Sequence, residues 1–141
     1  MTSDSQSVEP LQPRATVILI IEDEFLVRLA VAAYLRDSGY TVIEVSNASE
    51  ALIVIASQTH IDLVFSDIRI PGWMDGEVLA NWLSIRRPEI PVILTSGVIT
   101  PPLKYKTNAF RFIPKPYVLD NVEKAIRELL DKAPGATGAS N

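Results

Sequence analysis

The sequence predicts a doubly wound α/β domain, in which helices cover both faces of a parallel sheet. Short apolar runs alternate along the chain with helical patterns, and the runs lie at 16–21, 40–45, 61–65, 91–94 and 110–113. The run at 91–94 is apolar throughout, and the run at 16–21 is apolar after Thr16, as is typical of strands that are buried on both faces. The alternation of strand and helix favours the same architecture.

The first and last helices are recognised by apolar residues three and four positions apart. The first is expected from about Phe25 to Arg36, and Ser38-Gly39 ends it. The last begins near Leu119. It is expected to bury one apolar stripe, made of Val122, Ala125, Ile126, Leu129 and Leu130.

Capping residues predict where two further helices begin. Asn47, with Glu50 three residues later, resembles a capping box. Asp75 suits the N-cap of a helix with apolar residues at Val78, Leu79, Trp82 and Leu83, and Trp82 is expected in the core. The segment 97–109 contains two adjacent prolines and little periodicity, so we expect a short or irregular fourth helix there.

Length and composition indicate one globular domain. The chain has 141 residues, and 48% of them are apolar, which is enough for a core. We expect the domain to span 15–132, with flexible tails at 1–14 and 133–141, because both ends are polar or rich in small residues.

The residue counts exclude several function classes. A net charge of −4 argues against nucleic-acid binding by bulk charge. The chain has no cysteine, which excludes disulfides and thiolate chemistry, and its single histidine, His60, excludes a multi-histidine metal site. We expect His60 at the surface without a partner. No membrane-spanning stretch or secretory signal is recognisable, so we expect a cytoplasmic protein that does not contact a membrane.

Polar residues follow four of the predicted strands. They are Glu22-Asp23-Glu24, Ser66-Asp67, Thr95-Ser96-Gly97 and Pro114-Lys115-Pro116. Ligands of open α/β sheets bind beyond the carboxyl ends of the strands. Carboxylates crowded there favour a hard divalent cation such as Mg²⁺, and a lysine supplies a point charge for phosphate. The set indicates phosphoryl chemistry with a carboxylate as acceptor.

These segments make the chain similar to the receiver domain of two-component response regulators, over roughly 16–131. The matching segments are Val-Ile-Leu-Ile-Ile-Glu-Asp-Glu (17–24), Asp-Leu-Val-Phe-Ser-Asp-Ile-Arg-Ile-Pro-Gly (62–72), Met-Asp-Gly (74–76), Pro-Val-Ile-Leu-Thr-Ser-Gly (91–97) and Phe-Ile-Pro-Lys-Pro-Tyr (112–117). The resemblance implies a flavodoxin-like fold with strand order 2-1-3-4-5. It leaves open whether the chain is a single-domain receiver or part of a longer protein.

The resemblance also implies residue roles at the metal site. Asp67 is the expected phosphoacceptor. Asp23, Asp67 and the backbone carbonyl of Arg69 are expected to bind Mg²⁺ directly, and Glu22 through water. No catalytic turnover of an external substrate is implied, so the chain is expected to be a phosphoacceptor that assists its own phosphorylation and dephosphorylation.

Three further residues are assigned by the resemblance. Ser96 and Lys115 are expected to contact the phosphoryl group, Ser96 and Phe112 to act as the switch, and the Lys115-Pro116 bond to be cis. The implied phosphodonor is a histidine kinase or a phosphotransfer protein, and phosphorylation is expected to switch the binding of a downstream protein that the sequence does not identify.

The sequence departs from the family pattern at four places. Glu22 stands where aspartate is commoner, Ser96-Gly97 replaces Thr-Ala, and the segment 97–109 is broken by prolines. Trp73 lengthens the loop before Met74 by one residue and is expected to pack locally.

Other interpretations of the same residues remain open. The acids after the first strand could cap a helix, and Phe112 could be plain core. The domain could be a receiver-like interaction module that does not use phosphate, although none of the expected acids or Lys115 is missing. A phosphohydrolase is less favoured, because such enzymes usually carry a second aspartate where this chain has Arg69.

Overall fold

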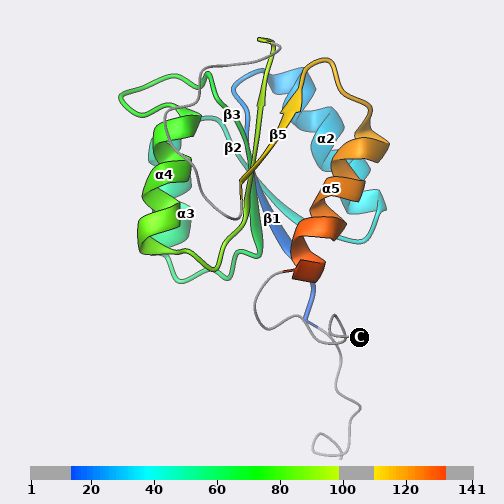
Figure 1. Ribbon diagram of the computed structural model, residues 1–141, viewed down its shortest axis with the longest axis horizontal. Helices are drawn as coiled ribbons and strands as arrows, with labels where there is room; N and C mark the ends of the chain where they lie inside the picture. Colours follow the sequence, from blue (N-terminus) through cyan, green and yellow to red (C-terminus); the bar gives the residue numbers. More distant parts are fainter. Residues whose placement is uncertain (1–13, 99–109, 133–141) are drawn as a thin grey trace, which may run out of the picture.

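Five parallel strands form a sheet at the centre of the molecule (Figure 1). The computed structural model describes residues 14–98 and 110–132, and the strands within them are β1 (Val17–Ile21), β2 (Thr41–Val45), β3 (Leu63–Asp67), β4 (Val92–Ser96) and β5 (Phe110–Pro114). Their order is β2-β1-β3-β4-β5, and every neighbouring pair is parallel. The predicted flavodoxin-like topology is therefore confirmed.

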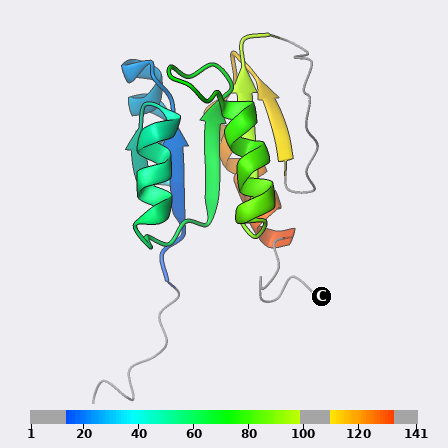
Figure 2. The same ribbon diagram turned by 90° about the vertical axis from the view of Figure 1, so that its left-hand side faces the viewer.

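Helices cover both faces of this sheet. In the described part of the chain they are α2 (Phe25–Asp37), α3 (Ala48–Ala56), α4 (Gly76–Arg86) and α5 (Leu119–Lys132). The pair α3 and α4 lies on one face and the pair α2 and α5 on the other (Figures 1 and 2). None of these helices is both long and apolar enough to cross a membrane.

Each face of the sheet has its own apolar core, because side chains alternate along a strand. On β1, Leu19 and Ile21 pack with α3 and α4, whereas Ile18 and Ile20 pack with α2 and α5. All four side chains are fully buried. The continuous apolar runs thus predicted a sheet between two helical layers correctly.

Strands β3 and β4 each extend two residues beyond the expected ends at 65 and 94. The register pairs Ser66 with Leu94 and Asp67 with Thr95. Backbone pairing in a parallel ladder does not depend on side-chain polarity, so the polar residues continue the strands. As a result, Asp67 and Ser96 are held by the sheet itself, where the sequence had suggested loops.

The predicted caps are present at the starts of α3 and α4. The side chain of Asn47 accepts a 2.9 Å hydrogen bond from the Glu50 amide, and Asp75 accepts one of 2.9 Å from the Val78 amide. Glu50 reaches back to the amide of Ser46, at 2.8 Å, one residue before the expected partner. Both caps satisfy amides that have no partner inside the helix.

The structure corrects several side-chain expectations. Leu129 and Leu130 are only partly buried, because they lie on the last turns of α5 at the margin of the core. Trp82 packs against the core as expected but is only partly buried, and the guanidinium of Arg86 lies 5.6 Å from its ring centre. Trp73 is 73% exposed, so most of its side chain faces solvent and not the neighbouring loop.

His60 is exposed as expected, but it has partners. Its ring lies 2.7 Å from the carboxylate of Asp62 and 3.1 Å from the guanidinium of Arg14. The expected helix between 97 and 109 falls, from residue 99 onward, outside the described residues. The predicted tails do so too, except for Arg14.

Candidate functional site

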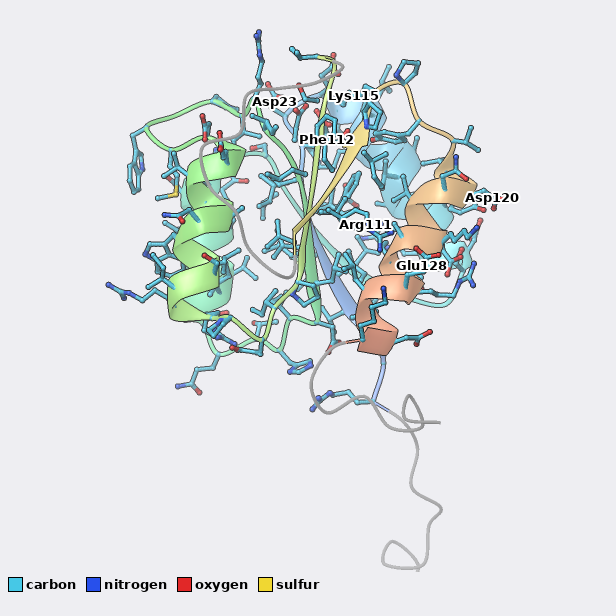
Figure 3. The ribbon with its side chains drawn as sticks, in the orientation of Figure 1. Asp23, Arg111, Phe112, Lys115, Asp120 and Glu128 are labelled. Carbon is cyan, nitrogen blue, oxygen red and sulfur yellow. The ribbon has the colours of Figure 1, made fainter. Side chains whose placement is uncertain are left out.

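The predicted site residues meet at the carboxyl edge of the sheet. In Figure 3, Asp23 and Lys115 lie close together at this edge, and Phe112 lies just below them. Asp23 follows β1, Asp67 ends β3, and Lys115 follows β5. Strand order explains the meeting, because β3 lies directly between β1 and β4 and parallel strands end on the same side.

Three carboxylates form the centre of the site, and we call Glu22, Asp23 and Asp67 the acidic pocket. One oxygen from each lies within 4.8 Å of the others. Glu22 and Asp67 are 2% and 7% exposed, whereas Asp23 is open to solvent. Negative charges this close repel one another unless a cation joins them.

Lys115 supplies one such cation. Its ammonium donates to the Oδ2 atom of Asp67 at 2.7 Å and to the Oε1 atom of Glu22 at 3.2 Å. Burial lowers the pKa of Lys115, but the hydrogen bond to Asp67 and the charges of both carboxylates outweigh burial and hold that pKa above its ordinary value. Lys115 is therefore charged across the physiological pH range.

Backbone amides orient the two buried carboxylates. The Oε2 atom of Glu22 accepts a hydrogen bond of 3.0 Å from the Glu24 amide, and the Oδ1 atom of Asp67 accepts one of 3.1 Å from the Arg69 amide. Burial raises the pKa of Glu22, while the Glu24 amide and Lys115 oppose the rise. Each carboxylate thus has one oxygen facing an amide and one facing the lysine.

A close backbone contact fixes the position of Asp67. The start of α4 approaches the end of β3, and the Gly76 amide donates to the Ile68 carbonyl at 2.8 Å. A Cβ atom on Gly76 would lie only 2.2 Å from the carbonyl oxygen of Asp67. Only glycine allows α4 to lie so close to the proposed phosphoacceptor.

Ser96 ends β4, the strand beside β3, and it is 2% exposed. Its hydroxyl oxygen accepts a 3.1 Å hydrogen bond from the Val98 amide, which leaves the hydroxyl proton available for another acceptor. The Ser96 carbonyl accepts a hydrogen bond from the Lys115 amide at 2.8 Å, so the serine and the lysine are joined through the backbone.

Phe112 lies on β5 opposite Leu94 and is partly buried against the core beneath α3 and α4. This position fits both the proposed switch and the simpler interpretation as a core residue. The peptide bond Lys115-Pro116 is cis, as expected.

Two neighbours of the pocket were not singled out from the sequence. Arg28 donates to the backbone carbonyl of Glu22, and Tyr117 packs edge-on against Phe65 with its ring centre 5.9 Å away. Burial raises the pKa of Tyr117 to about 12. In the sequence, Arg28 lies one turn into the first predicted helix. That position only weakly indicates that its long side chain can reach back to the loop after β1.

The acidic pocket fits a divalent cation of the Mg²⁺ type. Its donors are carboxylate oxygens, the ligands that Mg²⁺ prefers, and exposed Asp23 leaves the site open on one side. A magnesium ion keeps several waters and binds phosphate oxygens, so one open side is what such a site requires. The donor set therefore agrees with the cofactor that the sequence predicted.

A five-stranded parallel sheet of this order, with an acidic pocket and a lysine at its carboxyl edge, defines a flavodoxin-like class of α/β domain, and comparison with known proteins identifies the family. Residues 18–127 match the family model described as the response regulator receiver domain. The chain therefore belongs to the response regulator receiver family.

The relatives of this chain include a transcriptional regulator and a sensor kinase. It is 33% identical over 117 residues to the DNA-binding transcriptional regulator NtrC of Salmonella typhimurium, covering 78% of this chain and 24% of that protein. It is also 33% identical over 122 residues to the sensor kinase CckA of Brucella abortus, covering 84% of this chain and 13% of that one. The chain thus spans a quarter or less of these relatives.

A solved structure supports the same assignment over nearly the whole domain. A response regulator receiver protein from Sinorhizobium medicae WSM419 has a TM-score of 0.77 and 27% identity. The match covers 86% of this chain and 98% of that chain. The similarity therefore extends beyond the site to the complete receiver fold.

Proposed function

We propose that this domain accepts a phosphoryl group on Asp67 and thereby changes its affinity for a protein partner. The observation that carries the proposal is the contact of Lys115 with both Asp67 and Glu22, at 2.7 and 3.2 Å, beside the exposed carboxylate of Asp23. The pocket joins an acceptor carboxylate, oxygen ligands for a cation and a positive charge for phosphate.

In the proposed site, Asp23 and Asp67 would hold Mg²⁺ together with the backbone carbonyl of Arg69, and Glu22 would hold it through water. When bound, the ion neutralises negative charge on the phosphoryl oxygens. An oxygen of Asp67 attacks phosphorus, the bond from phosphorus to the donor breaks, and the leaving group keeps that electron pair. Lys115 then contacts a phosphoryl oxygen, and its charge offsets part of the charge that arrives.

Ser96 and Phe112 are the proposed switch. The phosphoryl group adds nearly two negative charges and new hydrogen-bond acceptors beside Ser96. Among residues 14–98 and 110–132 the Ser96 proton has no acceptor, and the amide of Val98 is the group that Ser96 releases if its hydroxyl turns toward Asp67. Phe112, on the neighbouring strand, is only partly buried and has room to change its burial.

The proposed phosphodonor is a histidine kinase or a phosphotransfer protein in the cytoplasm. Exposed apolar side chains beside the pocket support a protein donor: Phe25 and Leu26 are 59% and 75% exposed, and Val118 is 62% exposed. Phe25 lies two residues after Asp23, and Val118 lies three after Lys115, so a protein docked on them would reach the pocket.

Phosphorylation can be tested with a small donor. The protein is incubated with acetyl phosphate and Mg²⁺, and intact mass is measured with time. We expect the mass to increase by one phosphoryl group, the increase to require the divalent cation, and Asp67→Asn to abolish it. Asp62→Asn is the matched control, because Asp62 lies at the opposite end of β3.

Two results would contradict the proposal. One is a wild-type mass that does not change with acetyl phosphate and that also shows no binding of beryllofluoride. The other is equal modification of wild type and Asp67→Asn, which would place the phosphoryl group on another residue.

A further inference from the structure

Arg28 joins helix α2 to the loop that carries the acidic pocket. Its Nη1 atom donates a 2.7 Å hydrogen bond to the backbone carbonyl of Glu22, and its Nε atom lies 3.4 Å from a carboxylate oxygen of Glu44 on β2. Its guanidinium also lies over the ring of Phe25, 5.5 Å from the ring centre. The side chain is only 17% exposed, so these contacts form in a partly dry setting.

The contact with Glu22 fixes more than one residue. The Glu22 amide donates to the Val45 carbonyl at 3.1 Å, so Glu22 is held by its amide on one side and by Arg28 on the other. A peptide bond is planar, and the plane that contains the Glu22 carbonyl also contains the Cα atom of Asp23. Holding that carbonyl therefore restricts where the exposed Asp23 side chain begins.

We propose that Arg28 is a positioning residue of the acidic pocket, which raises the affinity of the pocket for a divalent cation by fixing the Glu22–Asp23 peptide. The inference rests on the proposed function, because it assumes that the pocket binds the cation. Arg28 acts through the backbone of the loop that carries the metal ligands. In other proteins, residues that hydrogen-bond to metal ligands without touching the metal orient those ligands in the same way.

Charge and position predict opposite effects for the loss of Arg28. The positive charge of Arg28, held against the backbone of the pocket loop, offsets part of the negative charge there, so its loss by charge alone would tighten the binding of a divalent cation. Removal of a positioning contact loosens Asp23 and weakens binding. The direction of the change therefore separates the two explanations.

Arg36 provides a matched control on the same helix. It pairs with the same Glu44 at 2.8 Å and donates to a backbone carbonyl, that of Val42, at 3.0 Å. Val42 lies near the start of β2, away from the carboxyl edge where the pocket lies. Arg36→Met thus removes the same charge and a similar pair of contacts without touching the pocket loop.

The test measures Mn²⁺ binding by electron paramagnetic resonance, with Mg²⁺ as competitor, in the unphosphorylated protein. We expect Arg28→Met to weaken binding by about tenfold or more, the range seen when outer partners of metal ligands are removed. Arg36→Met is expected to stay within about twofold of wild type, since Arg36 contacts β2 and not the pocket loop. Arg28→Lys, which keeps a donor for the Glu22 carbonyl, is expected to bind between wild type and Arg28→Met.

Urea denaturation of each variant shows whether it is folded under the binding conditions. If Arg28→Met is not folded, the Mn²⁺ affinity of Arg28→Lys is compared with that of wild type instead. Binding by Arg28→Met that equals or exceeds that of Arg36→Met overturns the inference, as does Arg28→Lys matching wild type when Arg28→Met is not folded. If wild type binds no Mn²⁺, the proposed cation site itself is wrong. If wild type binds Mn²⁺ and the loss of Arg28 has no effect, only the role of Arg28 is wrong.

Discussion

The approach of Gly76 to Asp67 yields the sharpest prediction about this domain. A Cβ atom at position 76 would lie 2.2 Å from the carbonyl oxygen of Asp67 and 2.9 Å from the Cα atom of Ile68. Both neighbours are backbone atoms, which cannot rotate away as a side chain can. Gly76→Ala therefore forces the end of β3 and the start of α4 apart by roughly 1 Å before an ordinary contact is reached.

The expected magnitude follows from that displacement. A misplacement of about 1 Å in a reacting group lowers rates by about a hundredfold, and overpacking of this kind lowers the free energy of unfolding by about 1–3 kcal/mol. The assay follows the rate of phosphorylation by acetyl phosphate through intact mass. Urea denaturation of the same variant gives its stability.

Gly39→Ala separates the two effects. Gly39 has a φ of +103° with open space around it, so alanine is strained there and destabilises the protein by about 1 kcal/mol far from the pocket. We expect Gly39→Ala to keep the wild-type phosphorylation rate. A Gly76→Ala protein that phosphorylates as fast as Gly39→Ala would refute the reasoning.

Two further predictions concern side chains around the pocket. Lys115→Met removes the shared cation from two buried carboxylates, so it should lower the free energy of unfolding by about 1–3 kcal/mol at neutral pH. Mg²⁺ should then stabilise the variant more than it stabilises wild type. Equal stabilisation of both proteins by Mg²⁺ in urea denaturation would contradict this prediction. Tyr117→Phe should increase stability by about 1 kcal/mol, because the buried hydroxyl has no partner among the described residues. Burial raises the pKa of Tyr117 from 10.0 in the unfolded chain to about 12 in the folded protein. The stability that wild type gains from the protonated tyrosine is therefore complete below pH 10.0 and is lost as pH rises through about 12. The stability advantage of Tyr117→Phe should widen between these pH values, and a constant advantage would be contrary evidence.

Local patterns in the sequence were sufficient for the order of the described elements and for the starts of α3 and α4. The caps Asn47 and Asp75 lie where short-range spacing placed them, because a cap bonds to amides two or three residues away. The strand order came from the resemblance, since apolar runs show that strands are buried and not which strands are neighbours. Apolar pattern also misjudged the lengths of β3 and β4, as backbone pairing continues through Asp67 and Ser96.

The sequence by itself determined a parallel sheet between helices and the presence of carboxylates, a serine and a lysine beyond its strands. Only the tertiary structure decided that Lys115 contacts Glu22 from 93 positions away, that α4 lies against the backbone of Asp67, and that Arg28 reaches back to the Glu22 carbonyl. The starts of the capped helices depend on neighbouring residues, whereas these contacts depend on how whole elements pack, and packing depends on every side chain between them.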